Sequence, residues 1–174
     1  MDWQQAASAF DPVSVAWDNG GPLIRLSNNN TTASAFPEHS RRTGWKQARG
    51  NTVLQASPQG SRFEFTLQMD SLVHKEIVLG VVDPSSAPQT PSCLHSAKSD
   101  EGVFIHFFGF DQIAEGDFIT ALINLDEMKL TFARNGAMMQ EIPAITIPST
   151  VVPVVELYGH DHPSITIVPL PFLD

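Results

Sequence analysis

Alternating apolar and polar positions run along much of this chain, most clearly between residues 115 and 142. In the segment 118–125, every second side chain is apolar and falls on one side of an extended backbone: Ile119, Ala121, Ile123 and Leu125. The segment 128–134 repeats this alternation: Met128, Leu130 and Phe132. A period of two residues is typical of a β-strand with one face in a core. The sequence therefore predicts two neighbouring strands in this region.

Two short polar breaks predict the turns of the same region. Asp126-Glu127 separates the first strand from the second, and Asn135-Gly136 follows the second strand. Asn-Gly is the pair best suited to the positive φ angles of a type I′ hairpin turn. A third strand over residues 137–142 would then close an antiparallel meander.

Other segments extend the strand pattern over the rest of the chain. The segment 62–69 alternates strictly, so one face is predicted to point inward and the other outward: Phe63, Phe65, Leu67 and Met69 inward; Glu64, Thr66 and Gln68 outward. The remaining predicted strands are 13–17, 23–27, 77–82, 103–108, 152–157 and 164–168. Many short strands without a convincing long helix predict an all-β fold, an antiparallel β-sandwich.

The chain is predicted to form one domain. Its length of 174 residues suits a single β-sandwich, and no internal repeat or linker divides it. We expect an N-terminal arm over 1–12, the sandwich over 13–168 and a C-terminal tail over 169–174. The segment 83–101 is rich in proline and serine and is predicted to be a long loop.

Five segments carry, in their order along the chain, a family resemblance. The first is 24–33, with Leu26-Ser27 and Thr32-Ala33, and the second is 44–65, with Trp45, Arg49, Gly50, Phe63 and Phe65. The third is 77–81, with Leu79-Gly80-Val81, and the fourth is 116–136, with Gly116-Asp117, Leu130-Thr131-Phe132 and Asn135-Gly136. The fifth is 152–167, with Val152-Pro153-Val154-Val155 and Ile165-Thr166-Ile167. Together they resemble a SPRY (B30.2-like) domain over nearly the whole chain. The segment between Val82 and Gly102 departs from the family's pattern by its length.

The resemblance implies a bent, concanavalin-like jelly roll that is not an enzyme. Domains of this family commonly recruit a peptide or a protein through loops, as an adaptor or as a structural subunit of a larger complex. Loops at the ends of rigid strands are where such contacts are made. From loop position and side-chain chemistry, we expect the following residues to bind the partner: Arg41, Arg42, Phe110, Gln112, Tyr158, His160, Asp161 and His162.

Composition narrows the kind of partner. The formal net charge of −9 argues against nucleic acid, because phosphate binding needs clustered Lys and Arg, and it favours a basic protein partner. No apolar run approaches the roughly 20 residues that cross a membrane, and no signal peptide is visible. Cys93 is the single cysteine, so we expect the cytoplasm or another reducing intracellular compartment.

Two groups of side chains could support chemistry, and each has a plainer interpretation. His160 and His162 could share a divalent metal with Glu156, but a turn between two strands explains the same residues. Cys93 and His95 could form an activated nucleophile, but no third group is placed to orient them. We therefore expect no catalytic residue, metal ligand or cofactor.

Several other polar and aromatic residues are expected to be structural. The carboxylates in turns are expected to be solvated: Asp111, Glu115, Asp117, Asp126 and Glu127. Arg49 is expected to be a buried hydrogen-bonding strut, and Trp45 to pack rather than to anchor an interface. Two alternative functions stay open: a carbohydrate-binding, lectin-like sandwich that would use Trp45 and the asparagines 28–30, and a His-x-His metal-dependent enzyme.

Overall fold

The structure, a computed structural model, describes most of the chain. The described residues are 9–20, 24–35, 45–58, 60–72, 76–86, 102–108, 113–143, 147–158 and 163–168. Fourteen β-strands and no helix occur among them. It follows that none of these residues belongs to a helix able to span a lipid bilayer.

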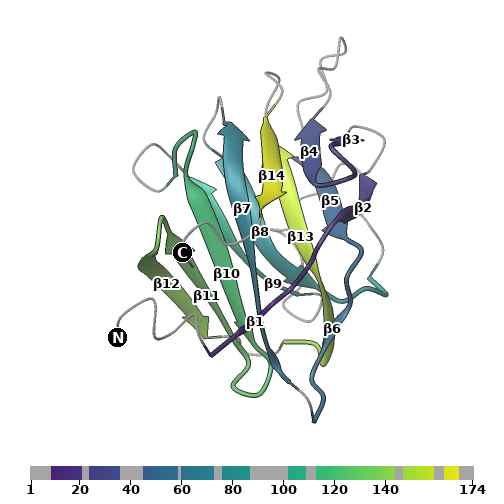
Figure 1. Cartoon of the computed structure of the whole chain (residues 1–174), viewed down its shortest axis with the longest axis vertical. Coiled ribbons are helices and arrows are strands. Elements are labelled where there is room, and N and C mark those ends of the chain that lie inside the picture. The colour runs from purple at the N-terminus through teal and green to yellow at the C-terminus, as the bar shows by residue number, and fades with distance from the viewer. Residues whose placement is uncertain are drawn as a thin grey trace.

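The strands form two sheets that stack face to face (Figure 1). The eight-stranded sheet has the order β12 (Ala137–Pro143), β11 (Lys129–Arg134), β10 (Phe118–Asn124), β7 (Arg62–Ser71), β14 (Ser164–Val168), β4 (Thr32–Ala35) and β3 (Ile24–Ser27), with β1 (Asp11–Pro12) beside β7. The six-stranded sheet has the order β2 (Trp17–Gly20), β5 (Trp45–Gly50), β13 (Thr150–Tyr158), β8 (Glu76–Val82) and β9 (Gly102–Phe108), with β6 (Leu54–Gln55) beside β13.

Neighbouring strands are antiparallel throughout both described sheets, with the exception of β1, which runs parallel to β7. Sequence alternation explains the two layers, because each strand sends every second side chain into the space between the sheets. The eight-stranded sheet contributes Phe65, Leu67, Met69, Ile119, Ile123 and Phe132, among others. The six-stranded sheet contributes Ile77, Leu79, Val81, Val151, Val155 and Leu157. The predicted antiparallel β-sandwich is confirmed.

The predicted meander is formed by β10, β11 and β12. Ile119 of β10 lies opposite Arg134 of β11, and the pairing continues to Asn124 opposite Lys129. In the next turn Asn135 has φ 50° and Gly136 has φ 78°, as the Asn-Gly pair predicts. Asparagine and glycine adopt this left-handed region at low cost, so the turn returns the chain directly into β12.

The outer face of the eight-stranded sheet differs from its prediction. Glu64 and Thr66 of β7 were expected to point outward into solvent, but they are only 2% and 1% exposed. Phe10 packs against Leu122 and Ala133 on this outer face, and β1 pairs with β7 beside Glu64. The predicted orientation is right, while the predicted exposure is wrong, because residues before β2 cover part of this face.

Candidate functional site

Five connections between the two described sheets lie at one end of the sandwich. They join β2 to β3, β4 to β5, β7 to β8, β9 to β10 and β13 to β14, each time carrying the chain from one sheet to the other. We call this end the Tyr158 end, because β13 finishes there, and the opposite end the Thr150 end, where β13 begins. The Tyr158 end is the upper end in Figure 1.

Strand register places the borders of these connections side by side. In the six-stranded sheet, Tyr158 lies opposite Trp45, and the next strand pair places Glu76 opposite Phe108. Since Leu157 lies opposite Ile77, all four of these residues are at the same end. In the eight-stranded sheet, Ser164 lies opposite both Ser34 and Ser71.

The predicted partner-binding residues belong to three of these five connections. Arg41 and Arg42 fall between β4 and β5, Phe110 and Gln112 between β9 and β10, and His160, Asp161 and His162 between β13 and β14. These seven residues lie outside the described part of the chain, and Tyr158 is described by its backbone at the end of β13. The structure therefore brings the bordering strand ends together, and the binding role of these side chains stays a prediction.

A hydrogen-bonded carboxylate holds the described part of the Tyr158 end in place. Asp117 Oδ2 accepts a hydrogen bond of 2.6 Å from the Ala114 amide and forms an ion pair of 2.7 Å with Arg134 Nε. Its other oxygen, Oδ1, accepts a hydrogen bond of 2.8 Å from Asn135 Nδ2. Asn135 Oδ1 in turn accepts a hydrogen bond of 2.8 Å from the Phe118 amide. Asp117 thus joins the connection after β9 to the β11–β12 turn.

The same connection is also fixed to the end of β7. The Gly116 amide donates to the Met69 carbonyl at 2.7 Å, and the Met69 amide donates to the Asp117 carbonyl at 2.8 Å. The Leu72 amide donates to Glu115 Oε1 at 3.2 Å. Gly116 adopts φ +83°, a conformation that glycine reaches without strain. These contacts make residues 113–117 a rigid border for the connections at this end.

Sequence reasoning missed this role of Asp117. The turn carboxylates were expected to be solvated, and Asp126 and Glu127 are indeed exposed, but Asp117 is buried. The signal was present in the sequence, because Gly116-Asp117 and Asn135-Gly136 both belong to the family resemblance. What the sequence did not show is that the Asp117 side chain contacts Asn135 of the second pair, and Arg134 just before it.

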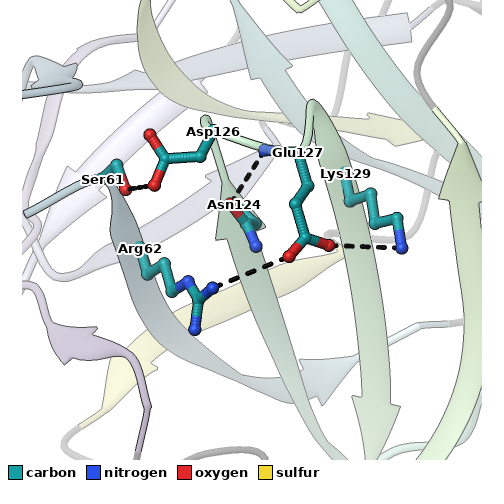
Figure 2. A network of polar contacts seen from close by, with 6 residues as sticks. All are labelled: Ser61, Arg62, Asn124, Asp126, Glu127 and Lys129. Atoms are coloured by element: carbon teal, nitrogen blue, oxygen red, sulfur yellow. Dashed lines mark hydrogen bonds and ion pairs between the residues drawn. The ribbon is translucent and has the colours of Figure 1, made fainter.

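The Thr150 end carries a different polar network, shown in Figure 2. Glu127 pairs with Arg62 at 3.6 Å and with Lys129 at 3.3 Å. Asn124 Oδ1 accepts a hydrogen bond of 3.1 Å from the Glu127 amide, and Ser61 hydrogen-bonds to Asp126. The ion-pairing side chains are between 39% and 50% exposed, so water screens them.

The proline- and serine-rich loop also begins at the Thr150 end. Its borders, Val82 and Gly102, lie opposite each other, and Val152 pairs with Val82 from the other side. Hydrogen bonds from the Ser85 hydroxyl and backbone amide lower the pKa of Asp83, opposed weakly by burial and helped by Arg49. Cys93 and His95, the candidate reactive pair in this loop, lie outside the described residues.

Arg49 forms the hydrogen-bonding strut that the sequence predicts, although its side chain is half-buried and not fully buried as expected. Its Nε donates to Gln47 Oε1 at 2.7 Å, and one of its terminal nitrogens donates to the Ser86 carbonyl at 2.6 Å. Gln47 Nε2 donates to Glu156 Oε1 at 3.0 Å, and Glu156 is fully buried. Glu156, a candidate third metal ligand, is therefore part of a buried chain of side chains on the six-stranded sheet. Within the described ranges, no three metal-ligating side chains come together.

Comparisons with known proteins find similar structures, but they find no similar sequence. No protein-family model matches the sequence, and no curated protein matches it either. The SPRY domain of human HERC1, a crystal structure, aligns with a TM-score of 0.69 at 12% identity, covering 90% of this chain and 99% of that one. The TRIM65 PSpry domain aligns with a TM-score of 0.63 at 13% identity, covering 91% of this chain and 94% of that one.

A third solved structure, stonustoxin, aligns with a TM-score of 0.64 at 10% identity. The alignment covers 90% of this chain but 27% of the stonustoxin chain. All three alignments span almost the whole chain while the sequences differ at most positions. The chain therefore has a SPRY-like β-sandwich fold, in agreement with the resemblance found in the sequence.

Proposed function

We propose that this chain is a non-catalytic protein-interaction module that binds a peptide or a protein segment at its Tyr158 end. The observation that carries the proposal is the topology: five connections between the described sheets, including those with the predicted binding residues, begin and end at this one edge. The SPRY-like fold supports it, because SPRY domains generally serve as interaction modules without catalytic activity.

The rigidity of the described scaffold supports the same proposal. Loops that bind partners lose less conformational entropy when their borders are already fixed. At the Tyr158 end, Asp117 and Asn135 fix one border by side-chain hydrogen bonds, and strand pairing at Tyr158 and Trp45 fixes another. The chain acts in this proposal as an adaptor or a structural subunit of a multi-protein assembly.

Charge suggests the chemistry of the partner. The net charge of −9 attracts basic segments over a distance of about one Debye length, about 8 Å at physiological salt. We propose a partner with a positively charged surface, in a reducing intracellular compartment that keeps the single Cys93 as a thiol.

Affinity purification from native lysate tests this proposal. Wild type is compared with Tyr158→Ala combined with His160→Ala, and with a matched double variant at the Thr150 end, Val53→Ala combined with Met128→Ala. Val53 and Met128 are exposed, so their loss leaves the core intact. We expect a set of proteins that wild type and the Thr150-end variant retain and that the Tyr158-end variant loses.

Two results would count against the proposal. If both variants retain the same proteins as wild type, the binding surface is not the Tyr158 end. If wild type retains nothing from a lysate that is known to express the chain, the interaction function itself is contradicted. Thermal unfolding of each variant is measured in parallel, so that a loss of binding is not a loss of folding.

A further inference from the structure

The short strand β1 occupies an open edge of β7. β14 pairs with β7 only as far as Thr66, so the next residues of β7 have no partner from β14 on that side. β1 fills this place in parallel, with Asp11 opposite Phe63 and Pro12 opposite Glu64. The Val13 amide donates to the Glu64 carbonyl at 2.9 Å. Two paired residues and a few contacts are a small attachment for a strand, so a modest change in free energy can release it.

Glu64 is an unusual residue to find under such an attachment. Its side chain points to the outer face of the eight-stranded sheet, opposite Leu122 of β10, and it is 2% exposed. Its Oε2 is buried and has no hydrogen-bond partner among the residues that the structure describes. An ionised carboxylate in this position loses water without gaining a donor, whereas a protonated carboxyl group loses much less.

The charges around Glu64 make ionisation still less favourable. Asp11 of β1 lies opposite Phe63, the residue before Glu64, and its like charge adds to the effect of burial on Glu64. Arg62, two residues before Glu64 on the same face, pairs with Glu127. The β10 side chains on this face that are described near Glu64 cannot titrate: Thr120, Leu122 and Asn124.

We propose that β1 is a proton-controlled strand, which docks on β7 while Glu64 is protonated and is released when Glu64 ionises. Release removes Pro12 from beside Glu64 and Asp11 from its neighbourhood, so that the carboxylate regains water. It also withdraws Phe10 from Leu122 and Ala133, which uncovers the edge of β7 and an apolar patch next to it. The inference does not depend on the proposed function, because β1 is not part of the predicted binding loops.

The direction of the pH dependence follows from the docked state. Burial, and after it the charge of Asp11, raises the pKa of Glu64 from 4.5 to about 7. Docking is therefore strongest below the ordinary pKa of 4.5 and is lost as the pH rises through about 7. The difference between these two pKa values sets an upper limit of roughly 300-fold on the change in the docking equilibrium.

Amide hydrogen exchange of the full chain between pH 5.5 and 8 tests this inference. The reporter is the Val13 amide, and the reference is the Met69 amide, which is bonded to the Asp117 carbonyl away from β1. After correction for the intrinsic rates, we expect protection of Val13 to fall 10-fold or more over this range while protection of Met69 stays constant. In Glu64→Gln, which cannot ionise, protection of Val13 should not depend on pH.

Two further variants separate this mechanism from a general effect of acidic residues. Asp70→Asn removes another carboxylate of β7 whose pKa is raised by burial, but Asp70 bonds Thr166 of β14, and it should behave as wild type. Asp11→Asn removes the second cause and should move the midpoint of the transition to lower pH. The inference is overturned if Val13 protection in wild type does not change with pH, or if Glu64→Gln changes as wild type does.

Discussion

The two ends of the β10–β11–β12 meander contain the same kinds of side chain and hold the chain in different ways. At the Tyr158 end, Asp117 pairs with Arg134 at 2.7 Å, and at the Thr150 end, Glu127 pairs with Arg62 at 3.6 Å. An asparagine completes each network, Asn135 in one and Asn124 in the other. The Asp117 side chain is 9% exposed, while that of Glu127 is 50% exposed.

Burial, rather than residue type, decides what each network contributes. An exposed ion pair is screened by water and contributes roughly 0–1 kcal/mol. A buried carboxylate with several donors leaves those donors unsatisfied when it is removed, at a cost of several kcal/mol. The comparison therefore predicts a rigid Tyr158 end beneath the proposed binding loops and a Thr150 end that tolerates substitution.

Asp117→Ala tests this difference with the largest expected effect. The substitution leaves the Ala114 amide and the Asn135 side-chain amide without their acceptor and the Arg134 guanidinium without its ion pair. We expect a loss of about 3 kcal/mol in the free energy of unfolding, measured by urea denaturation. Glu127→Ala is the matched control, and an equal loss in both variants would contradict the comparison.

Asn135→Ala should have the second largest effect. It removes the hydrogen bonds to Asp117 and from the Phe118 amide, and it places alanine at φ 50°. We expect a loss of about 2 kcal/mol in unfolding free energy. Asn135→Gly separates the two causes, because glycine keeps the backbone free of strain while the hydrogen bonds are still lost. Equal stability of Asn135→Gly and wild type would show that the side-chain bonds contribute nothing.

Met128→Gly is expected to act in the opposite direction. Met128 lies in the β10–β11 turn with φ 50°, is exposed, and forms no part of the core cluster. A non-glycine residue in the left-handed region is strained, and glycine relieves this strain at some cost in chain entropy. We expect a gain of about 0.5 kcal/mol, visible as a higher urea midpoint. A loss of stability would mean that the methionine side chain has a packing role.

Glu127→Gln should have the smallest effect. It removes the charge that faces Arg62 and Lys129 and keeps the shape of the side chain. We expect a loss below about 0.5 kcal/mol at low salt, and none in 1 M sodium chloride, where the Debye length is about 3 Å. A loss that persists at high salt would show that this network is not governed by screened charges.

The alternation of residues along single strands was enough to predict the sandwich and its meander. It correctly assigned the inward face of β7 and the Asn135-Gly136 turn, because both depend on neighbours within a few residues. It failed for the exposure of Glu64, because Phe10 and β1, which lie against this part of the sheet, come more than fifty residues earlier in the chain. A periodic pattern shows which face of a strand is polar, but it does not show what lies on that face.

The candidate site depends even more on distant contacts. Arg42 and His160 were selected one loop at a time, and nothing local in the sequence shows that their loops begin at the same edge. The register of Tyr158 opposite Trp45 shows this, and it joins residues more than one hundred positions apart. Asp117 was misjudged for the same reason, because its partners Arg134 and Asn135 lie at the end of β11 and just after it, with the whole of β10 in between.

The strand order has a consequence for how this chain is made. β13 lies between β5 and β8, and β14 lies between β7 and β4, so the last strands in sequence occupy inner positions in both sheets. A nascent chain that ends before residue 150 contains β5 and β8 without β13, which pairs with both, and it contains β7 and β4 without β14, which pairs with both. Pairings of such long sequence separation form slowly and leave sheet edges open to other chains. Synthesis must therefore pass β14 before both sheets of this domain can close, and until then the nascent chain has open sheet edges that can pair with other chains.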